Sequence, residues 1–225
     1  MKVKLLTCVS DINHPGLAKF RHSLDKFKWD YHIIHDPNIG WDWGGWDNFY
    51  NWAKAEAEKP DGYTHVILSD GFDVVALGDM QEVIEKYKKI CGGEKGFLVS
   101  TEKAAFPVFD LHYRREDYPT PTRWPYINCG GLMTDLESLF KIYHESDRSI
   151  VSQLWFHKRY LYQNQDETLK LDVNCEIFQT LAFKDDTDFT TENERLINNH
   201  TQTQPVLAHG NGKVDMQFVY DIYGL

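Results

Sequence analysis

The chain has 225 residues, a formal net charge of −10, and a composition that is 42% hydrophobic and 26% charged. These values predict one globular domain with a sizeable core and exclude a disordered chain. The acidic balance and the lack of a basic stripe argue against a duplex nucleic-acid binder, although a local patch or a metal could still serve such an acceptor. The sequence has no apolar run near the ~20 residues of a membrane span and no signal-peptide pattern at its start, so we expect a cytoplasmic protein. Its four cysteines show no zinc spacing and are expected to be reduced, in or near the core.

The first hundred residues alternate strand-like apolar runs with helical apolar spacing. We predict strands at 3–9, 31–34, 65–68 and 96–100, and helices at 15–27, 47–58 and 79–90. The helix ends are marked by Pro15 in a first turn, by Asp47 as an N-cap, and by Gly92 and Gly93 after a last turn. This alternation is typical of βαβ units around a largely parallel sheet.

The second half of the chain is less regular. We predict a Pro-rich surface segment at 104–125, helices at 135–144 and 150–162, strands at 169–173 and 205–208, and a polar, acidic loop at 185–193. The sequence shows no internal repeat and no low-complexity segment. We therefore treat residues 1–225 as a single domain.

Two carboxylates follow the third predicted strand. Asp70 and Asp73 stand three residues apart, directly after the apolar run 65–68. In an open α/β sheet the ligand crevice lies at the carboxyl ends of the strands, where this pair would sit. Two hard oxygen ligands suit Mg²⁺ or Mn²⁺, which usually share their remaining positions with substrate phosphates. The alternative is an ordinary acidic turn.

A second candidate segment, His209-Gly210-Asn211-Gly212, also follows an apolar run. A neutral imidazole is a good third ligand for Mn²⁺ and a poorer one for Mg²⁺. The glycines would let the backbone approach a phosphate and present its N–H groups, and Lys213 could contact the same phosphate. The alternative is a turn with an incidental histidine.

Three further segments could bind a sugar or a nucleotide. The Asn and Gly residues of 128–131 suit close packing of a sugar, or form a simple turn. Glu102, at a predicted strand end, could bind a sugar hydroxyl or act as a base, or it could be a capping residue on a solvent-facing loop. The tryptophans and glycines of 41–46 could form a stacking platform or fill the end of the core.

Together, these strand-end groups match the chemistry of a metal-bound nucleotide diphosphate. A diphosphate becomes a leaving group when a divalent cation neutralises its developing charge. This is the chemistry of a nucleotide-sugar glycosyltransferase. The alternatives are a nucleotide-sugar hydrolase or phosphotransferase, a sugar-nucleotide binding module without transferase activity, and a non-enzymatic scaffold.

The chain resembles the glycosyltransferase domain of the procollagen lysyl hydroxylases and their viral and bacterial relatives. The matching segments occur in order at 6–10, 43–45, 69–75, 99–102, 127–131, 153–156, 171–172, 177–179 and 205–212. The most specific are the Asp-x-x-Asp segment that begins at Asp70 and the His-Gly-Asn-Gly segment that begins at His209. The resemblance implies a GT-A fold, which is a Rossmann-like α/β fold with a mostly parallel central sheet flanked by helices. It also implies a nucleotide-binding half at 1–100 and an acceptor-binding half at 101–225.

The resemblance further implies a donor, UDP-glucose or UDP-galactose, and roles for individual residues. The implied ligands of Mn²⁺, or of Mg²⁺, are Asp70, Asp73 and His209. The residues implied to lie beside the uridine are Thr7, Val9, Ser10 and Phe72. Those implied to approach the diphosphate are Gly210, Asn211 and Gly212. Those implied to line the donor sugar and the acceptor, and expected to be catalytic, are Glu102, Asn128 and Asp172.

The chain departs from the family pattern at several positions. Phe49 stands where the family has a phosphate-binding lysine, a contact that Lys213 could replace, and Phe106 stands in place of a sugar-side tryptophan. Val151 and Ser152 stand in place of an acidic pair, which leaves the catalytic carboxylate open. The candidates for that carboxylate are Glu102, Asp172, Asp166 and Glu167.

The acceptor is expected to be a hydroxyl group. It could belong to a hydroxymethylated pyrimidine in phage DNA, to a hydroxylysine-like protein side chain, or to a glycan. A base in duplex DNA would have to be flipped out of its stack. The side chains that could contact such an acceptor are Arg114, Arg115, Arg123 and Trp124. A free-standing relative of this kind suggests a microbe or a virus, and a viral protein would work in the host cytoplasm.

Overall fold

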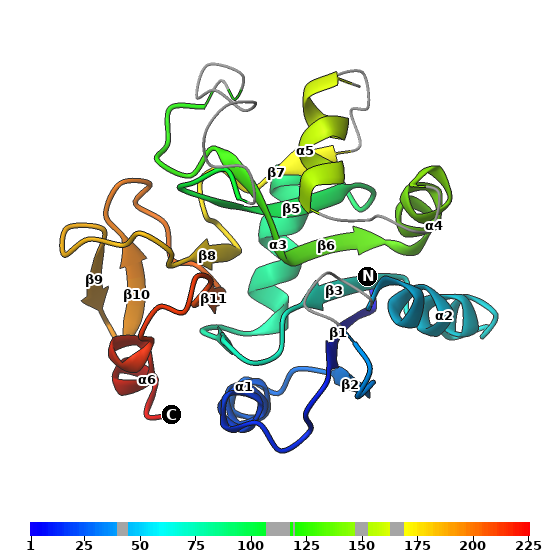
Figure 1. The fold of residues 1–225 in the computed structure, drawn as a ribbon, viewed down its shortest axis with the longest axis horizontal. Helices are drawn as coiled ribbons and strands as arrows, with labels where there is room; N and C mark the ends of the chain where they lie inside the picture. Colours follow the sequence, from blue (N-terminus) through cyan, green and yellow to red (C-terminus); the bar gives the residue numbers. More distant parts are fainter. Residues whose placement is uncertain (40–44, 107–117, 119, 147–152, 163–168) are drawn as a thin grey trace.

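The computed structural model describes residues 1–39, 45–106, 118, 120–146, 153–162 and 169–225 (Figure 1). Its main sheet has six strands in the order β2-β1-β3-β6-β5-β7. In that order the strands span Tyr31–His35, Val3–Val9, His65–Ser69, Tyr126–Asp135, Phe97–Glu102 and Leu169–Leu171. Strand β6 is antiparallel to both β3 and β5, and the other pairings are parallel. The predicted α/β fold with a mostly parallel sheet is therefore confirmed.

Helices cover both faces of this sheet. On one face lie α2 (Trp46–Ala57), α4 (Leu136–Glu145) and α5 (Gln153–Tyr162), with α2 beside α4 in Figure 1. On the other face lie α1 (Pro15–Lys26) and α3 (Met80–Cys91). The two cores follow from the alternation of side chains along each strand: Leu5 and Ile67 pack on the α1 face, whereas Leu6 and Val66 pack on the α2 face.

A smaller sheet brings the last part of the chain to the middle of the molecule. It consists of β4 (Val74–Ala76), β11 (Leu207–His209) and β8 (Phe178–Thr180). Strand β11 is antiparallel to β4, with His209 opposite Val74, and parallel to β8. This register places the end of β11 next to the segment that follows β3.

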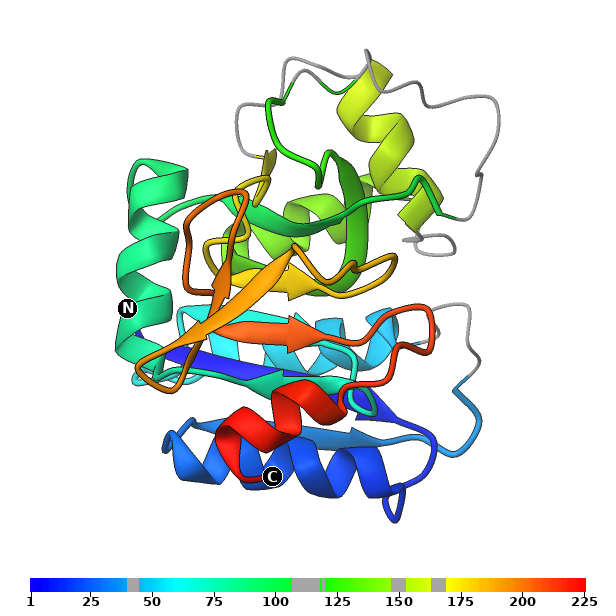
Figure 2. The same ribbon diagram turned by 90° about the vertical axis from the view of Figure 1, so that its left-hand side faces the viewer.

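A hairpin and a helix complete the C-terminal part. The hairpin pairs β9 (Phe189–Glu192) with β10 (Arg195–Asn198), and α6 spans Gln217–Tyr223. In Figure 2 the red α6 lies against the blue α1. The contact includes the ammonium of Lys19 over the ring of Tyr220, at 3.6 Å from its centroid. Among the described residues, no helix is both long enough and apolar enough to cross a bilayer.

Most helix-end signals act as the sequence predicts. Asp79 caps α3 by accepting the Glu82 N–H at 2.9 Å, and Gly92 ends this helix with a φ of 74°. Helix α2 differs, because it begins at Trp46 after Gly45 and has no side-chain cap. The prediction of Asp47 as an N-cap is therefore wrong; Asp47 lies in the first turn and accepts a hydrogen bond from the Tyr143 hydroxyl.

Three expectations for the second half need correction. Residues 128–131 do not form a turn but lie inside the long buried strand β6. The expected acidic loop at 185–193 contains strand β9. The expected surface segment at 104–125 buries Trp124 completely, at 0% exposure, and also buries Tyr118. The cysteines are all free, and Cys129 and Cys175 are buried.

Candidate functional site

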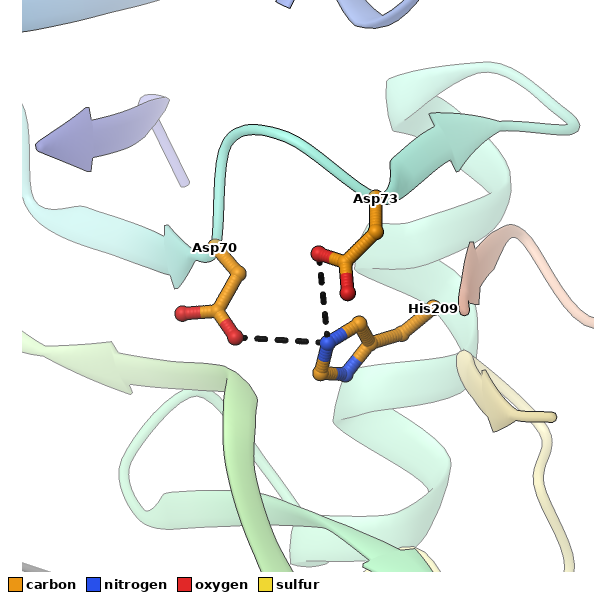
Figure 3. Close-up of side chains that lie close together, drawn as sticks. All are labelled: Asp70, Asp73 and His209. Carbon is orange, nitrogen blue, oxygen red and sulfur yellow. Dashed lines mark ion pairs between the residues drawn. The ribbon is translucent and has the colours of Figure 1, made fainter. Parts of the chain in front are cut away.

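Asp70, Asp73 and His209 lie together where β3, β4 and β11 meet, with their polar atoms facing one another (Figure 3). Asp70 follows β3, Asp73 precedes β4, and His209 ends β11. The Nε2 of His209 is 3.2 Å from Asp70 Oδ2 and 3.5 Å from Asp73 Oδ1. The fold thus brings together three side chains that the sequence placed on two remote segments.

This spacing fits a divalent cation. Two ligand atoms at right angles around such an ion lie ~3.0 Å apart when each is about 2.1 Å from it. The His209 side chain is 9% exposed, whereas those of Asp70 and Asp73 are 42% and 40% exposed. One side of the cluster is therefore packed in protein, and the carboxylate side is open to further ligands such as phosphate oxygens or water.

The two carboxylates of the cluster favour a positive charge at the position of the His209 ring. Burial lowers the pKa of His209, but the charges of Asp73 and Asp70 and their hydrogen bonds outweigh it and raise that pKa to about 10. For Asp73, burial raises the pKa, but the charge and hydrogen bond of His209 bring it below the ordinary value. Two carboxylates that hold a positive charge on a buried imidazole would also attract a metal cation.

Two glycines make the close approach of these segments possible. A Cβ on Gly130 would lie 2.0 Å from Cε1 of His209 and 2.8 Å from Oδ2 of Asp70. A Cβ on Gly71 would lie 2.6 Å from Oγ1 of Thr7. Because real Cβ atoms do not approach heavy atoms so closely, these positions require glycine for the cluster to form.

A bulge in β6 shapes the wall beside the cluster. Val99 pairs with Leu132 but the next residue, Ser100, pairs with Asn128, so three residues of β6 have no partner on β5. The segment Asn-Cys-Gly-Gly at 128–131, which in the sequence alone resembles a turn, is the part of β6 where this bulge occurs. Within it, the Gly130 N–H donates to Asn128 Oδ1 at 2.9 Å, and the Cys129 N–H donates to Oε1 of Gln153 at 3.2 Å.

Glu102 is the last residue of β5 and is buried, at only 3% exposure. Its Oε1 accepts from Gln153 Nε2 at 2.6 Å, its Oε2 accepts from Asn211 Nδ2 at 2.8 Å, and the amide of Asn128 nearby acts to lower its pKa. Burial raises the pKa of Glu102 to about 7, although the three amides and the charge of His209 act in the opposite direction. Glu102 is therefore not a capping residue on a solvent-facing loop but a buried carboxyl group at the end of a strand.

The segment after His209 is tied to its surroundings by hydrogen bonds. The Gly210 N–H donates to the Asp73 carbonyl at 2.7 Å, so it joins the two ligand segments and is not presented to a phosphate. The Oδ1 of Asn211 accepts the N–H groups of Leu181 and Ala182 at 3.1 and 3.0 Å. Gly212 and Lys213, which follow, are exposed.

Asp172 has a structural environment that the sequence did not predict. Its carboxylate accepts three backbone N–H groups, from Glu176, Ile177 and Phe178, each at 2.8 Å. Burial raises its pKa to about 6 in spite of these bonds. These contacts order the turn that leads into β8.

The residues predicted to surround the uridine lie at the end of β1 and in the turn after β3. Thr7 and Val9 are buried, Ser10 is half-buried, and the Thr7 Oγ1 has no hydrogen-bond partner within the described part of the chain. Phe72 is half-buried and packs against the ring of His14, with centroids 4.1 Å apart. The sequence alone did not indicate that His14 lies beside these residues.

Other predicted residues are placed differently. Phe49 lies on α2, is buried in the core, and is therefore a packing residue. Arg123 pairs with Asp185 and Asp188, at 2.9 Å each. Trp124 is fully buried, so its predicted contact with an acceptor is wrong. Several residues singled out in the sequence lie outside the described residues: Trp41, Asp42, Trp43, Gly44, Arg114, Arg115, Val151, Ser152, Asp166 and Glu167.

Comparison with known proteins gives a family match over almost the whole chain. The family model described as the PLOD GT domain matches residues 1–221. An uncharacterized protein of Acanthamoeba polyphaga mimivirus is 27% identical over 150 residues, which cover 65% of this chain and 31% of that protein. The multifunctional procollagen lysine hydroxylase and glycosyltransferase LH3 of Pongo abelii is 27% identical over 237 residues, which cover 96% of this chain and 30% of that protein. The chain thus spans about a third of the length of these two relatives.

The fold also matches a solved glycosyltransferase structure. A glycosyltransferase involved in the glycosylation of the major capsid of PBCV-1 aligns with a TM-score of 0.57 and 7% sequence identity, over 100% of both chains. At this identity the likeness concerns the fold alone. It agrees with the GT-A fold expected from the sequence.

Proposed function

The chain belongs to the PLOD GT domain family, and from this we propose that it transfers a hexose, glucose or galactose, from a UDP-sugar to a hydroxyl acceptor with the help of a divalent metal ion. The family and the fold establish a glycosyltransferase domain. The observation that carries the rest of the proposal is the convergence of Asp70, Asp73 and His209, whose ligand atoms lie within 4.8 Å of one another.

Asp70, Asp73 and His209 would hold the cation, and the imidazole ligand favours Mn²⁺ over Mg²⁺. When bound, such an ion neutralises the negative charge that develops on the departing diphosphate. The open side of the cluster, formed by the half-exposed carboxylates, supports this role because it leaves room for phosphate oxygens. Lys213, exposed four residues after His209, is the proposed additional phosphate contact.

The uridine is proposed to lie beside Thr7, Val9, Ser10 and Phe72. The unpartnered hydroxyl of Thr7 supports this placement, because a buried hydroxyl without a hydrogen bond is unfavourable and a uracil or ribose group could satisfy it. The ring of Phe72, packed on His14 at 4.1 Å, offers an aromatic surface at the same end of the sheet.

Glu102 is the proposed catalytic carboxylate. It is an acceptor surrounded by amide donors, and its pKa of about 7 is close to the pH at which a general base is most effective. It would take the proton of the acceptor hydroxyl or bind a hydroxyl of the donor sugar. For Asp172 we propose a positioning role in the turn before β8, because its oxygens are held by three backbone N–H groups.

For the acceptor we propose a hydroxyl on a protein side chain. The support is the similarity to the relative from Pongo abelii, which is a procollagen lysine hydroxylase and glycosyltransferase. A modified DNA base and a glycan remain the alternatives to be compared in the same assay. Arg123, bound to Asp185 and Asp188, is proposed to hold its own loop and not the acceptor.

A ligand-binding screen tests this function. Unfolding is measured with UDP, UDP-glucose and UDP-galactose, with and without Mn²⁺. We expect stabilisation only when nucleotide and metal are both present, by ~2.7 kcal/mol at a hundredfold excess over Kd. Asp73→Asn should abolish the shift, whereas Asp61→Asn, at an exposed turn, should retain it.

Measurements of turnover then distinguish a transferase from a hydrolase, a binding module and a scaffold. A transferase releases UDP faster when a hydroxyl acceptor is added. A hydrolase releases free sugar at its full rate without any acceptor. A binding module shows the metal-dependent shift and no turnover with any donor, and a scaffold shows neither.

A further inference from the structure

Gln153 has no role assigned so far, yet its side chain joins three elements of the site. It stands at the start of α5 and is buried. Its Oε1 accepts the Cys129 N–H at 3.2 Å, and its Nε2 donates to Glu102 Oε1 at 2.6 Å and to the Phe106 carbonyl at 2.9 Å. One amide therefore contacts the bulge of β6, the end of β5 and the segment that follows β5.

The orientation of this amide is fixed by the backbone. The bulge removes Cys129 from the β5–β6 ladder, so its N–H needs another acceptor, and Oε1 of Gln153 supplies it. With the oxygen held there, the NH₂ group must point to Glu102. A glutamine that rotated its amide by half a turn would place two donors, or two acceptors, against each other.

The other two amides around Glu102 follow the same rule. The oxygen of Asn211 accepts the N–H groups of Leu181 and Ala182, and the oxygen of Asn128 accepts the Gly130 N–H. Each amide can therefore offer only its NH₂ group to the carboxylate. The amides around Glu102 therefore present hydrogen-bond donors to its carboxylate.

We propose that Gln153 is a positioning residue that orients the carboxylate of Glu102 and fixes Phe106 beside it. This inference rests on the proposed function, because it assigns Gln153 to the acceptor side of the same site. A neutral amide suits this task better than a cation. A paired Arg or Lys would stabilise the charged carboxylate strongly and weaken it as a base.

The charged groups that face Glu102 from other elements do not replace Gln153. His209, on β11, acts on Glu102 through its charge. Lys103, the next residue in the chain, is turned to Asp188 and to the Phe183 carbonyl. Among the described residues, the hydrogen bonds to the Glu102 oxygens thus come from the amides of Gln153 and Asn211.

Two substitutions test the proposal. Gln153→Met removes all three hydrogen bonds at nearly constant length. Gln153→Glu keeps an oxygen for the Cys129 N–H but places a second carboxylate against Glu102, so it tests the donor even if the first variant folds poorly. The matched control is Gln81→Met on α3, where another glutamine donates to a glutamate, Glu85, at 3.0 Å on an exposed helix face.

We expect kcat to fall by about 10- to 100-fold in Gln153→Met, the range given by the loss of one hydrogen bond to a charged group, and by more in Gln153→Glu. The affinity for UDP with Mn²⁺ should stay within about twofold of the wild type, because Gln153 does not contact the metal ligands. Gln81→Met should match the wild type. Unchanged kcat, or a raised donor KM at unchanged kcat, would overturn the proposal.

A second readout does not depend on transfer. The titration of the Glu102 carboxyl is followed by ¹³C NMR in the metal-free protein and assigned with Glu102→Gln. The midpoint should move to higher pH in Gln153→Met and further in Gln153→Glu, since a donor is lost and then a like charge is added. An unmoved midpoint overturns the inference even if the protein is an active transferase. If instead no donor is turned over but the midpoint moves, the proposed function fails while the positioning of Glu102 by Gln153 is supported.

Discussion

The amide nitrogen of Asn211 donates to Oε2 of Glu102 at 2.8 Å, across 109 residues of sequence. Asn211 lies two residues after the metal-ligand candidate His209, and Glu102 ends β5. A single hydrogen bond therefore connects the loop of the candidate cation site to the candidate catalytic carboxylate. The loop that follows His209 thus also holds one oxygen of Glu102 in place.

Asn211→Asp tests this connection. The new carboxylate can still accept the N–H groups of Leu181 and Ala182, but it turns a second oxygen to Glu102. Loss of a charged hydrogen bond and gain of a like charge should lower kcat by at least about tenfold. Mn²⁺ binding, measured by electron paramagnetic resonance, should persist because the three ligands are unchanged. Full activity in Asn211→Asp would show that the hydrogen bond between Asn211 and Glu102 does not contribute to catalysis.

Gly130→Ala should weaken the metal-dependent binding of UDP. The added methyl group would lie 2.0 Å from the ring of His209, so this ring or the bulge of β6 must move. The ligand atoms of His209 and of the two aspartates would then lie farther apart. We expect the Kd for UDP in the presence of Mn²⁺ to rise by about tenfold or more in calorimetric titration, with little change in binding without the metal. Gly93→Ala is the control, because a Cβ there meets nothing within 4 Å. Retained metal-dependent binding in Gly130→Ala would contradict the assigned ligand geometry.

The sequence predicted much of the framework because the relevant signals are local. The apolar run before Asp70 became β3, and the capped, amphipathic segment after Asp79 became α3. The three ligand candidates could be nominated from strand-end positions, although β3 and β11 belong to different sheets. The resemblance to a known family then joined His209 to the two aspartates.

What the sequence did not predict depends on contacts between distant segments. The bulge at 128–131 exists because β6 pairs with β3 on one side and β5 on the other, and a short Gly-rich window resembles a turn. Gln153 carries no local signal, because its partners Cys129 and Glu102 are 24 and 51 residues away. Trp124 looked like a surface residue in a Pro-rich segment, but the chain folds it under Lys103 and His200.

Glu102 should make stability fall as pH rises. Its folded pKa of about 7 lies above the ordinary value of 4.5, so the native state holds a proton that the unfolded state has released. The contribution of Glu102 to the free energy of unfolding is fully present below pH 4.5. It is lost as the pH rises toward 7, by at most about 1.4 kcal/mol per pH unit. The measurement is the free energy of unfolding by urea from pH 4 to 8 for wild type and Glu102→Gln. The difference between the two should decline between these pH values and be level above 7; a level difference throughout would contradict the burial of an ionisable group.

His157 should act with the opposite sign. It is fully buried on α5, with its Nδ1 at the hydroxyl of Tyr118, and burial lowers its pKa from 6.5 to about 4. The folded state therefore keeps this ring neutral while the unfolded state takes up a proton below pH 6.5. Stability is fully present above that pH and is lost as the pH falls toward 4, again by up to about 1.4 kcal/mol per unit. His157→Gln should remove this acid-side slope in urea unfolding, whereas His22→Gln, at an exposed position of α1, should leave it intact. An equal slope in His157→Gln and wild type would mean that folding does not lower the pKa of this ring.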